Sequence, residues 1–150
     1  MIVKDMTRQE CLDVLSASRL GRLACVRDSH PYLVPIYCVF ADNNLYSFSM
    51  MGQKIEWMRT NPHVCVEIDQ FTQTREWRSV VAYGRYEELA DSPHWQRERL
   101  HAWSLLQTYA NWWEPGGLKP DPQPLAAASA HLFYRIRIER LTGRQAVAGD

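Results

Sequence analysis

The sequence predicts a mainly β domain, a six-stranded antiparallel barrel with short helices at its connections. Six segments have the composition of strands and are separated by turn clusters or helical patterns. Gly84 lies inside the longest of them, where barrels place bends and bulges. Closure into a barrel removes the open edges that such strands otherwise present. The predicted strands cover residues 21–27, 32–40, 45–50, 64–68, 77–89 and 131–141.

Three short helices are predicted at the connections, near residues 7–18, 53–61 and 92–107. Thr7 and Glu10 form a capping box that opens the first helix. Pro62 ends the second, because the residue before a proline is disfavoured in the helical region. The stretch 70–76 is expected to be an exposed loop. The last strand is expected to end at residues 142–144, with a frayed terminus after Arg144.

One strand has a proline in its interior, which restricts where that strand can lie. Pro35 has no backbone N–H, so we expect it at a bulge or at a sheet edge. A bulge could direct a backbone group toward a ligand, whereas an edge proline would only protect against aggregation.

Composition narrows the classes of function. The 150 residues suit one domain, residues 1–150, and the 17 basic residues equal the 17 acidic ones. Zero net charge argues against a nucleic-acid binder, which needs a basic face, and does not oppose dimerisation. No apolar run is long enough to cross a membrane, and the first residues do not form a signal peptide, so a cytoplasmic location is expected.

The cysteines and histidines do not predict a metal site. Cys11, Cys25, Cys38 and Cys65 occur singly, without zinc-like spacing, and are expected to be free thiols in a reducing compartment. Histidines 94 and 101 would lie two helical turns apart, too far for one ion.

The stretch 44–69 reads as strand, tight turn, helix and strand, and it carries the first functional signal. Ser47 and Ser49 alternate in the strand, Gly52 permits the turn, and Lys54 sits near the start of the helix. A helix N-terminus offers unpaired N–H groups and partial positive charge, so hydroxyls and an ammonium added there form a cradle for one phosphate. The plainer interpretation is a strand–turn–helix with a solvated lysine.

Several segments, in order and spacing, resemble a known family. The chain is similar to the pyridoxamine 5′-phosphate oxidase-like FMN-binding split barrels, most of all to the branch containing nitroimidazole-resistance proteins. The matching segments are Leu20–Ala24, Tyr32–Ile36, Tyr46–Ser49 through Gly52–Lys54 to Asn61–Cys65, Trp77–Gly84, and the ending Phe133–Ile138 with Thr142–Arg144.

The resemblance implies a homodimer with FMN bound at the subunit interface. It implies a strand beside the isoalloxazine ring, a turn that holds the phosphate, and a further segment around the flavin, often from across the interface. In that order, the implied cofactor-binding residues are Val34, Pro35, Ile36 and Tyr37; Phe48, Ser49, Gln53 and Lys54; and Trp77, Arg78 and Ser79. Trp112 and Trp113 are candidates to line the substrate pocket, although packing in the core or interface is an equal possibility.

The implied activity is reduction of a small planar electrophile, such as a nitro compound or quinone, by a nicotinamide donor. The flavin carries this chemistry, so no general acid or base is named. Gln53 stands where the true oxidase has an arginine, and vitamin B6 oxidation is therefore not expected. The alternatives are a non-enzymatic flavin binder or redox sensor, or a split barrel that uses haem or deazaflavin F420.

Overall fold

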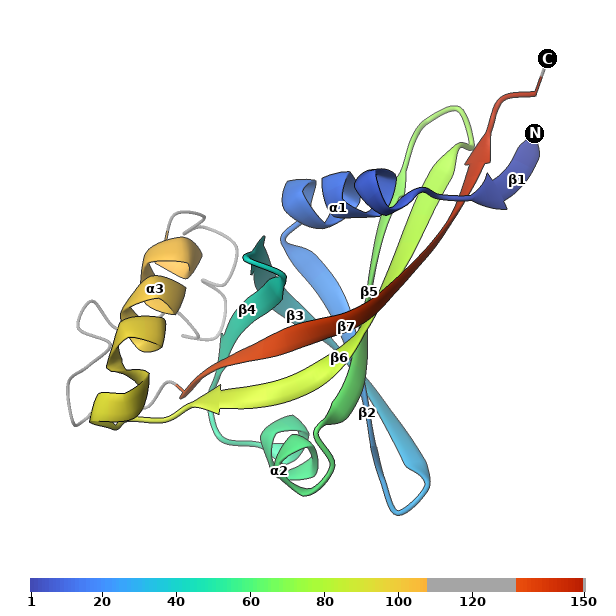
Figure 1. Cartoon of the computed structure of the whole chain (residues 1–150). Helices are drawn as coiled ribbons and strands as arrows, with labels where there is room; N and C mark the ends of the chain where they lie inside the picture. Colours follow the sequence, from blue (N-terminus) through green and yellow to red (C-terminus); the bar gives the residue numbers. More distant parts are fainter. Residues whose placement is uncertain (108–131, 150) are drawn as a thin grey trace.

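Seven antiparallel strands dominate the computed structural model, which describes residues 1–107 and 132–149 (Figure 1). The hydrogen-bonded order is β1-β7-β4-β3-β2-β5-β6, and β6 also pairs with β7, so six of the strands close into a ring. The predicted antiparallel barrel is therefore confirmed, with β1 added outside the ring. The strands are β1 Ile2–Asp5, β2 Leu20–Arg27, β3 His30–Ala41, β4 Asn44–Ser49, β5 His63–Phe71, β6 Trp77–Leu89 and β7 Leu132–Val147.

Three α-helices lie at the periphery of the barrel in the described ranges (Figure 1). α1 begins with the predicted capping box, because the Thr7 hydroxyl accepts from the Glu10 N–H and the Glu10 carboxylate accepts from the Thr7 N–H. The third helix begins as a 3₁₀ turn, η1, and becomes α-helical only at Gln96. The helices are α1 Arg8–Ala17, α2 Gln53–Thr60, η1 Pro93–Trp95 and α3 Gln96–Gln107.

Two tight turns set the register of the β2–β3–β4 meander without using glycine. Asp28 and Ser29 have φ values of 50° and 65°, and Asp42 and Asn43 have values of 51° and 62°. Two consecutive residues with positive φ are the geometry of the hairpin turn that matches strand twist, and aspartate and asparagine tolerate it.

The C-terminal end of the barrel differs from the sequence prediction. β7 does not end at residues 142–144 and the chain after Arg144 is not frayed, because β7 continues to Val147 between two partners. On one side of β7, Val147 pairs with Ile2 of β1, a strand that the sequence did not predict. On the other side, Ala146 pairs with Trp77 of β6. The predicted loop 70–76 is also too long, since β5 extends to Phe71 opposite Trp77.

Gly84 marks the predicted irregularity in β6. The register with β7 shifts between Tyr83 and Gly84. A Cβ at Gly84 would collide with the Arg137 carbonyl oxygen and lie 2.8 Å from Ile136 Cγ2. The two strands therefore approach more closely here than any side chain at position 84 allows.

Pro35 lies at a locally open edge, one of the two positions predicted for it. β3 pairs with β2 along this stretch, but its pairing with β4 begins only at Cys38 and Ser47. Among the described strands, none occupies the other side of β3 at Pro35. The missing N–H thus costs no ladder hydrogen bond there.

The apolar interior is divided between the barrel and one external layer. The main cluster fills the ring and includes Leu23, Ile68 and Ile136, each fully buried. A second cluster packs α3, through Ala102 and Leu106, on the outside of the sheet. None of the helices in the described ranges is both long and apolar enough to cross a bilayer.

Candidate functional site

A cavity of about 300 Å³ lies where β3, the end of β4 and the start of α2 meet. It gathers residues that are distant in sequence, because the meander brings β3 beside β4 and α2 follows β4 directly. Among the sequence-predicted binding residues, those that line it are Pro35, Ile36, Tyr37, Phe48, Ser49, Gln53 and Lys54.

Four further lining residues were missed as ligand contacts in the sequence. They are Tyr32, Met50, Met51 and Gly52. The two methionines are large apolar side chains that stay 39% and 53% exposed. Such residues next to a turn that leads into a helix are a signal that could have been read from the sequence.

Gly52 is the N-cap residue of α2, and its role differs from the predicted one. Its φ of −177° is extended backbone that any residue can adopt, so the turn itself does not require glycine. A Cβ at this position would meet no atom within 4 Å. Gly52 has no side chain with which to cap the helix, and no hydrogen bond within the described residues gives its first N–H groups a side-chain acceptor. Gly52 therefore leaves space and unpaired donors at the helix start.

Lys54 is the cation among the described residues that line this cavity. Its side chain is half-buried, and within residues 1–107 and 132–149 it makes no ion pair. Burial lowers the pKa of Lys54, and the nearby Cys25 thiol opposes this only in part. An ammonium that is partly desolvated without a carboxylate partner is poised for an anionic ligand.

Two serine hydroxyls near the cavity donate to the protein backbone. Ser49 Oγ donates to the Met50 carbonyl at 2.6 Å, at the cavity wall. Ser47 Oγ donates to the Tyr37 carbonyl at 2.6 Å and does not line the cavity. Of the two alternating serines, Ser49 therefore lines the cavity, and Ser47 fixes the strand that forms the wall.

The remaining wall is apolar. Pro35, Tyr37 and Phe48 contribute it, and the rings of Tyr37 and Phe48 meet edge to face with centroids 6.1 Å apart. The Tyr37 hydroxyl donates to the Leu106 carbonyl at 3.0 Å, which ties this wall to α3. Val34 packs against the core cluster inside the barrel and does not line the cavity.

The structure does not bring residues 77–79 to this cavity within one chain. They begin β6, where they pair with the ends of β5 and β7. Arg78 forms an ion pair with Glu10 of α1 at 3.6 Å. Side chains alternate along a strand, so Trp77 and Ser79 share the opposite face. A cofactor contact by these three residues stays a prediction.

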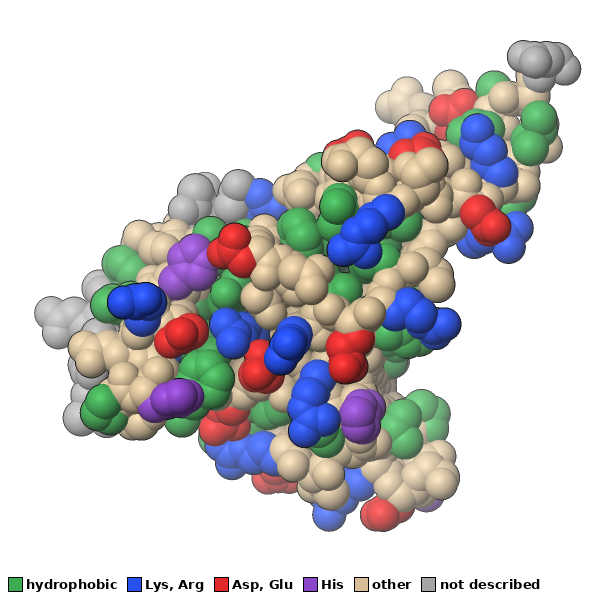
Figure 2. Space-filling model, viewed as in Figure 1, with side chains coloured by type: hydrophobic (Ala, Val, Ile, Leu, Met, Phe, Trp, Pro, Cys, Tyr) green, Lys and Arg blue, Asp and Glu red, His purple; other side chains and the backbone are tan. Residues whose placement is uncertain are grey.

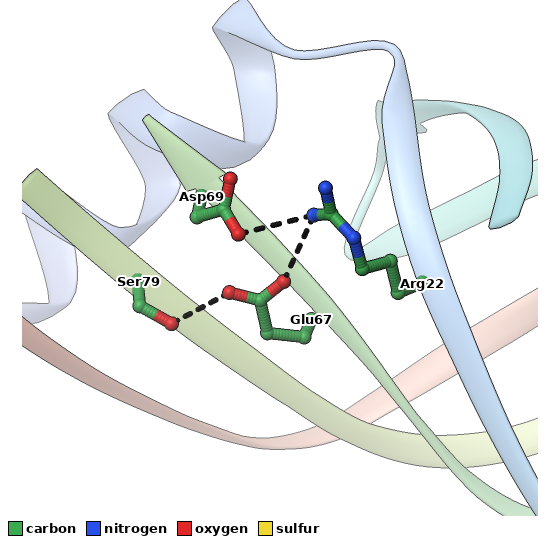
Figure 3. A network of polar contacts seen from close by, with 4 residues as sticks. All are labelled: Arg22, Glu67, Asp69 and Ser79. Atoms are coloured by element: carbon green, nitrogen blue, oxygen red, sulfur yellow. Dashed lines mark hydrogen bonds and ion pairs between the residues drawn. The ribbon is translucent and has the colours of Figure 1, made fainter. Parts of the chain in front are cut away.

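Ser79 belongs to a polar network on the outside of the barrel (Figure 3). Its hydroxyl donates to Glu67 Oε2 at 2.7 Å, and Arg22 Nη1 lies 3.3 Å from Glu67 Oε1 and 3.0 Å from Asp69 Oδ2. Burial raises the pKa of Glu67, the Ser79 hydrogen bond opposes the shift, and Asp69 adds to it. With two carboxylates for one guanidinium, this network is unsuited to a phosphate.

The remaining sequence predictions concern two tryptophans, the cysteines and possible metal ligands. Trp112 and Trp113 lie outside the described residues. The four cysteines are free thiols, and burial raises the pKa of Cys38 to about 12. The described residues contain no cluster of three or more potential metal ligands.

On the face shown in Figure 2, basic and acidic side chains are interspersed over β6 and β7 and do not form a patch of one sign.

The chain matches a family model described as pyridoxamine 5′-phosphate oxidase over residues 7–145. It is 53% identical to an uncharacterized protein of Rhizobium meliloti (strain 1021) over 150 residues, which cover 100% of this chain and 99% of that protein.

Solved structures agree with the fold. The crystal structure of an FAD-binding protein from Mesorhizobium loti has 49% sequence identity and a TM-score of 0.82, and the match covers 98% of this chain and 100% of that one. A candidate 5-nitroimidazole antibiotic resistance protein from Bacteroides thetaiotaomicron has 16% identity and a TM-score of 0.71, over 97% and 89% of the two chains. The second likeness supports the fold alone.

Proposed function

Because the chain belongs to the pyridoxamine 5′-phosphate oxidase family, we propose that it binds a flavin nucleotide, with the FMN unit in the cavity beside α2. The observation that carries this proposal is Lys54, a half-buried cation without an ion pair in the described chain, at the start of a helix whose N-cap residue is a glycine. The chain's similarity to an FAD-binding protein from Mesorhizobium loti supports a flavin as the ligand.

The two ends of the cavity suit the two ends of FMN. The anionic phosphate fits the end made by Lys54, the Gln53 amide and the first N–H groups of α2. The flat ring system fits the apolar wall, where Pro35 and Phe48 exclude water. The free space at Gly52 leaves room for the ligand beside the phosphate end.

We propose that the bound flavin serves an oxidoreductase that reduces a small planar electrophile, a nitro compound or quinone, at the expense of NADH or NADPH. The flavin supplies the hydride and electron transfer when it is bound. The protein's part is to hold the phosphate, to orient the ring against the Pro35–Tyr37 strand and to shape the space beside it. The proposed setting is the cytoplasm.

We also propose that the working form is a homodimer. On the outer face of β3, β2, β5 and β6, one cross-strand row beside the Arg22–Glu67 network is apolar: Leu33 lies opposite Ala24, Ala24 opposite Cys65, and Cys65 opposite Tyr83. Leu33 is 65% exposed and Tyr83 is 37% exposed. A contiguous exposed apolar patch is typical of an interface. Pro35 lies on the same face. A dimer formed through this face would cover the rim of the cavity and would allow Trp77 and Ser79 of the partner subunit to reach it.

The test begins with the absorbance spectrum of the purified protein, which separates a flavin from haem or deazaflavin. Apo-protein is then titrated with FMN and FAD by quenching of flavin fluorescence. We expect one flavin per chain; failure to bind either flavin would refute the proposal.

Turnover is a separate measurement. The loaded protein is mixed with NADH or NADPH and a panel of nitro compounds and quinones, and oxidation of the donor is followed by absorbance. Stoichiometric flavin without turnover across the panel would support the non-enzymatic alternative, a flavin carrier or redox sensor.

A further inference from the structure

A second cavity, of about 550 Å³, lies between the β2–β3 turn and α2. It shares Tyr32 and Gln53 with the cavity described above, so the two are neighbours on either side of the first residue of α2. The first cavity alone is at the lower end of the size range for small-molecule sites, and the two together lie well inside it. The space open to a ligand therefore continues past the proposed phosphate position into the second cavity.

Resting on the proposed flavin site, we infer that this second cavity holds the adenylate half of FAD, with the pyrophosphate passing Gln53. The inference concerns the choice between a mononucleotide and a dinucleotide. An FMN phosphate would end at Lys54 and Gln53 and leave the second cavity to water, whereas FAD would fill both.

The aromatic wall of the second cavity suits a purine base. The rings of Tyr32 and Trp57 lie with centroids 5.5 Å apart at an interplanar angle of 52°. Trp57 is half-buried, and it follows Gln53 by four residues on α2, so both side chains lie on the same side of the helix. Stacking of one base on an aromatic side chain strengthens binding roughly 5- to 150-fold.

The polar residues of the cavity suit the sugar and the second phosphate. The Arg27 guanidinium is only loosely engaged, with 3.9 Å between its Nε and Asp28 Oδ2. His30 Nδ1 is 2.9 Å from the Asp28 carbonyl oxygen, which leaves Nε2 on the other side of the ring. Arg27 would face the adenylate phosphate, and the Asp28 carboxylate, 88% exposed, would accept from ribose hydroxyls.

The test compares FAD with FMN on the same apo-protein. We expect FAD to bind at least tenfold more tightly than FMN. Trp57→Leu, which keeps an apolar side chain against the core, and Arg27→Gln, at an exposed position, should each weaken FAD about tenfold and change FMN affinity less than twofold. The matched controls are Phe71→Leu, an aromatic residue that is 74% exposed, and Arg8→Gln on α1; both lie outside the two cavities.

The outcomes separate the two proposals. Equal affinities for FAD and FMN, with neither variant distinguishing them, would overturn the second-cavity inference and leave the flavin site standing. Absence of binding by both flavins would overturn both. If Trp57→Leu does not fold, Arg27→Gln decides the question, because the Arg27 side chain is 43% exposed and its replacement leaves the core intact.

Discussion

Replacing Lys54 with methionine tests the phosphate end of the site most directly. An exposed ion pair contributes at most about 1 kcal/mol, whereas a hydrogen bond to a charged group contributes about 1.5–3 kcal/mol. Lys54 is half-buried and pairs with no carboxylate in the described chain, so we place its contribution to phosphate binding in the upper part of that range. A loss of about 2–3 kcal/mol corresponds to a dissociation constant for FMN roughly 30- to 150-fold higher.

The assay is fluorescence titration of apo-protein with FMN and with riboflavin, which has no phosphate. Lys54→Met should weaken FMN and leave riboflavin unchanged. Lys4→Met, at an exposed position in β1, is the matched control and should alter neither. Equal weakening of both ligands, or an unchanged FMN affinity, would refute the assignment of Lys54 to the phosphate.

The pH dependence of FMN affinity tests the assignment of Lys54 to the phosphate independently. Burial lowers the pKa of Lys54 below its ordinary 10.5 in the ligand-free protein, and a bound phosphate would raise it again. Between these two values the complex holds more protons than the free protein, so FMN affinity should fall as pH rises through the alkaline range. Lys54→Met should remove this slope, and a slope retained in the variant would point to another group.

Other perturbations test the fold and the dimer. Gly84→Ala should lower the free energy of unfolding by about 2–3 kcal/mol, measured in urea, because its Cβ meets the backbone of Arg137. Gly52→Ala has open space at its Cβ and loses only the preference for glycine at the N-cap, so it should lower the same quantity by about 1 kcal/mol or less. Leu33→Asp should convert the proposed dimer to a monomer in sedimentation, whereas Leu100→Asp, 45% exposed on α3, should not. The pKa of Glu67 is raised in the folded state, so wild-type stability should fall as pH rises just above 4.5. Glu67→Gln should flatten that slope.

The sequence by itself determined the strand-rich composition, the turns and the strand–turn–helix that carries Ser49, Gly52 and Lys54. These are local properties: the capping box at Thr7 and Glu10 is one helical turn long, and the proximity of Ser49, Gly52 and Lys54 follows from six residues of chain. The irregularity at Gly84 and the open edge at Pro35 were also predictable, because each follows from the chemistry of one residue.

Tertiary structure decided what depends on pairing between distant segments. β1 has only four residues, all exposed, and nothing local marks Ile2–Asp5 as a strand. It forms because the end of β7, from Arg144 to Val147, offers an edge. The side of the strand on which Arg78 lies, toward Glu10 and away from Ser79, is set by the register of β6 in the closed ring. The second cavity exists because the β2–β3 turn and α2 face each other. The Tyr32–Trp57 ring contact and the hydrogen bond from the Asn61 side-chain amide to the Val26 carbonyl join the two segments, and local sequence does not encode either contact.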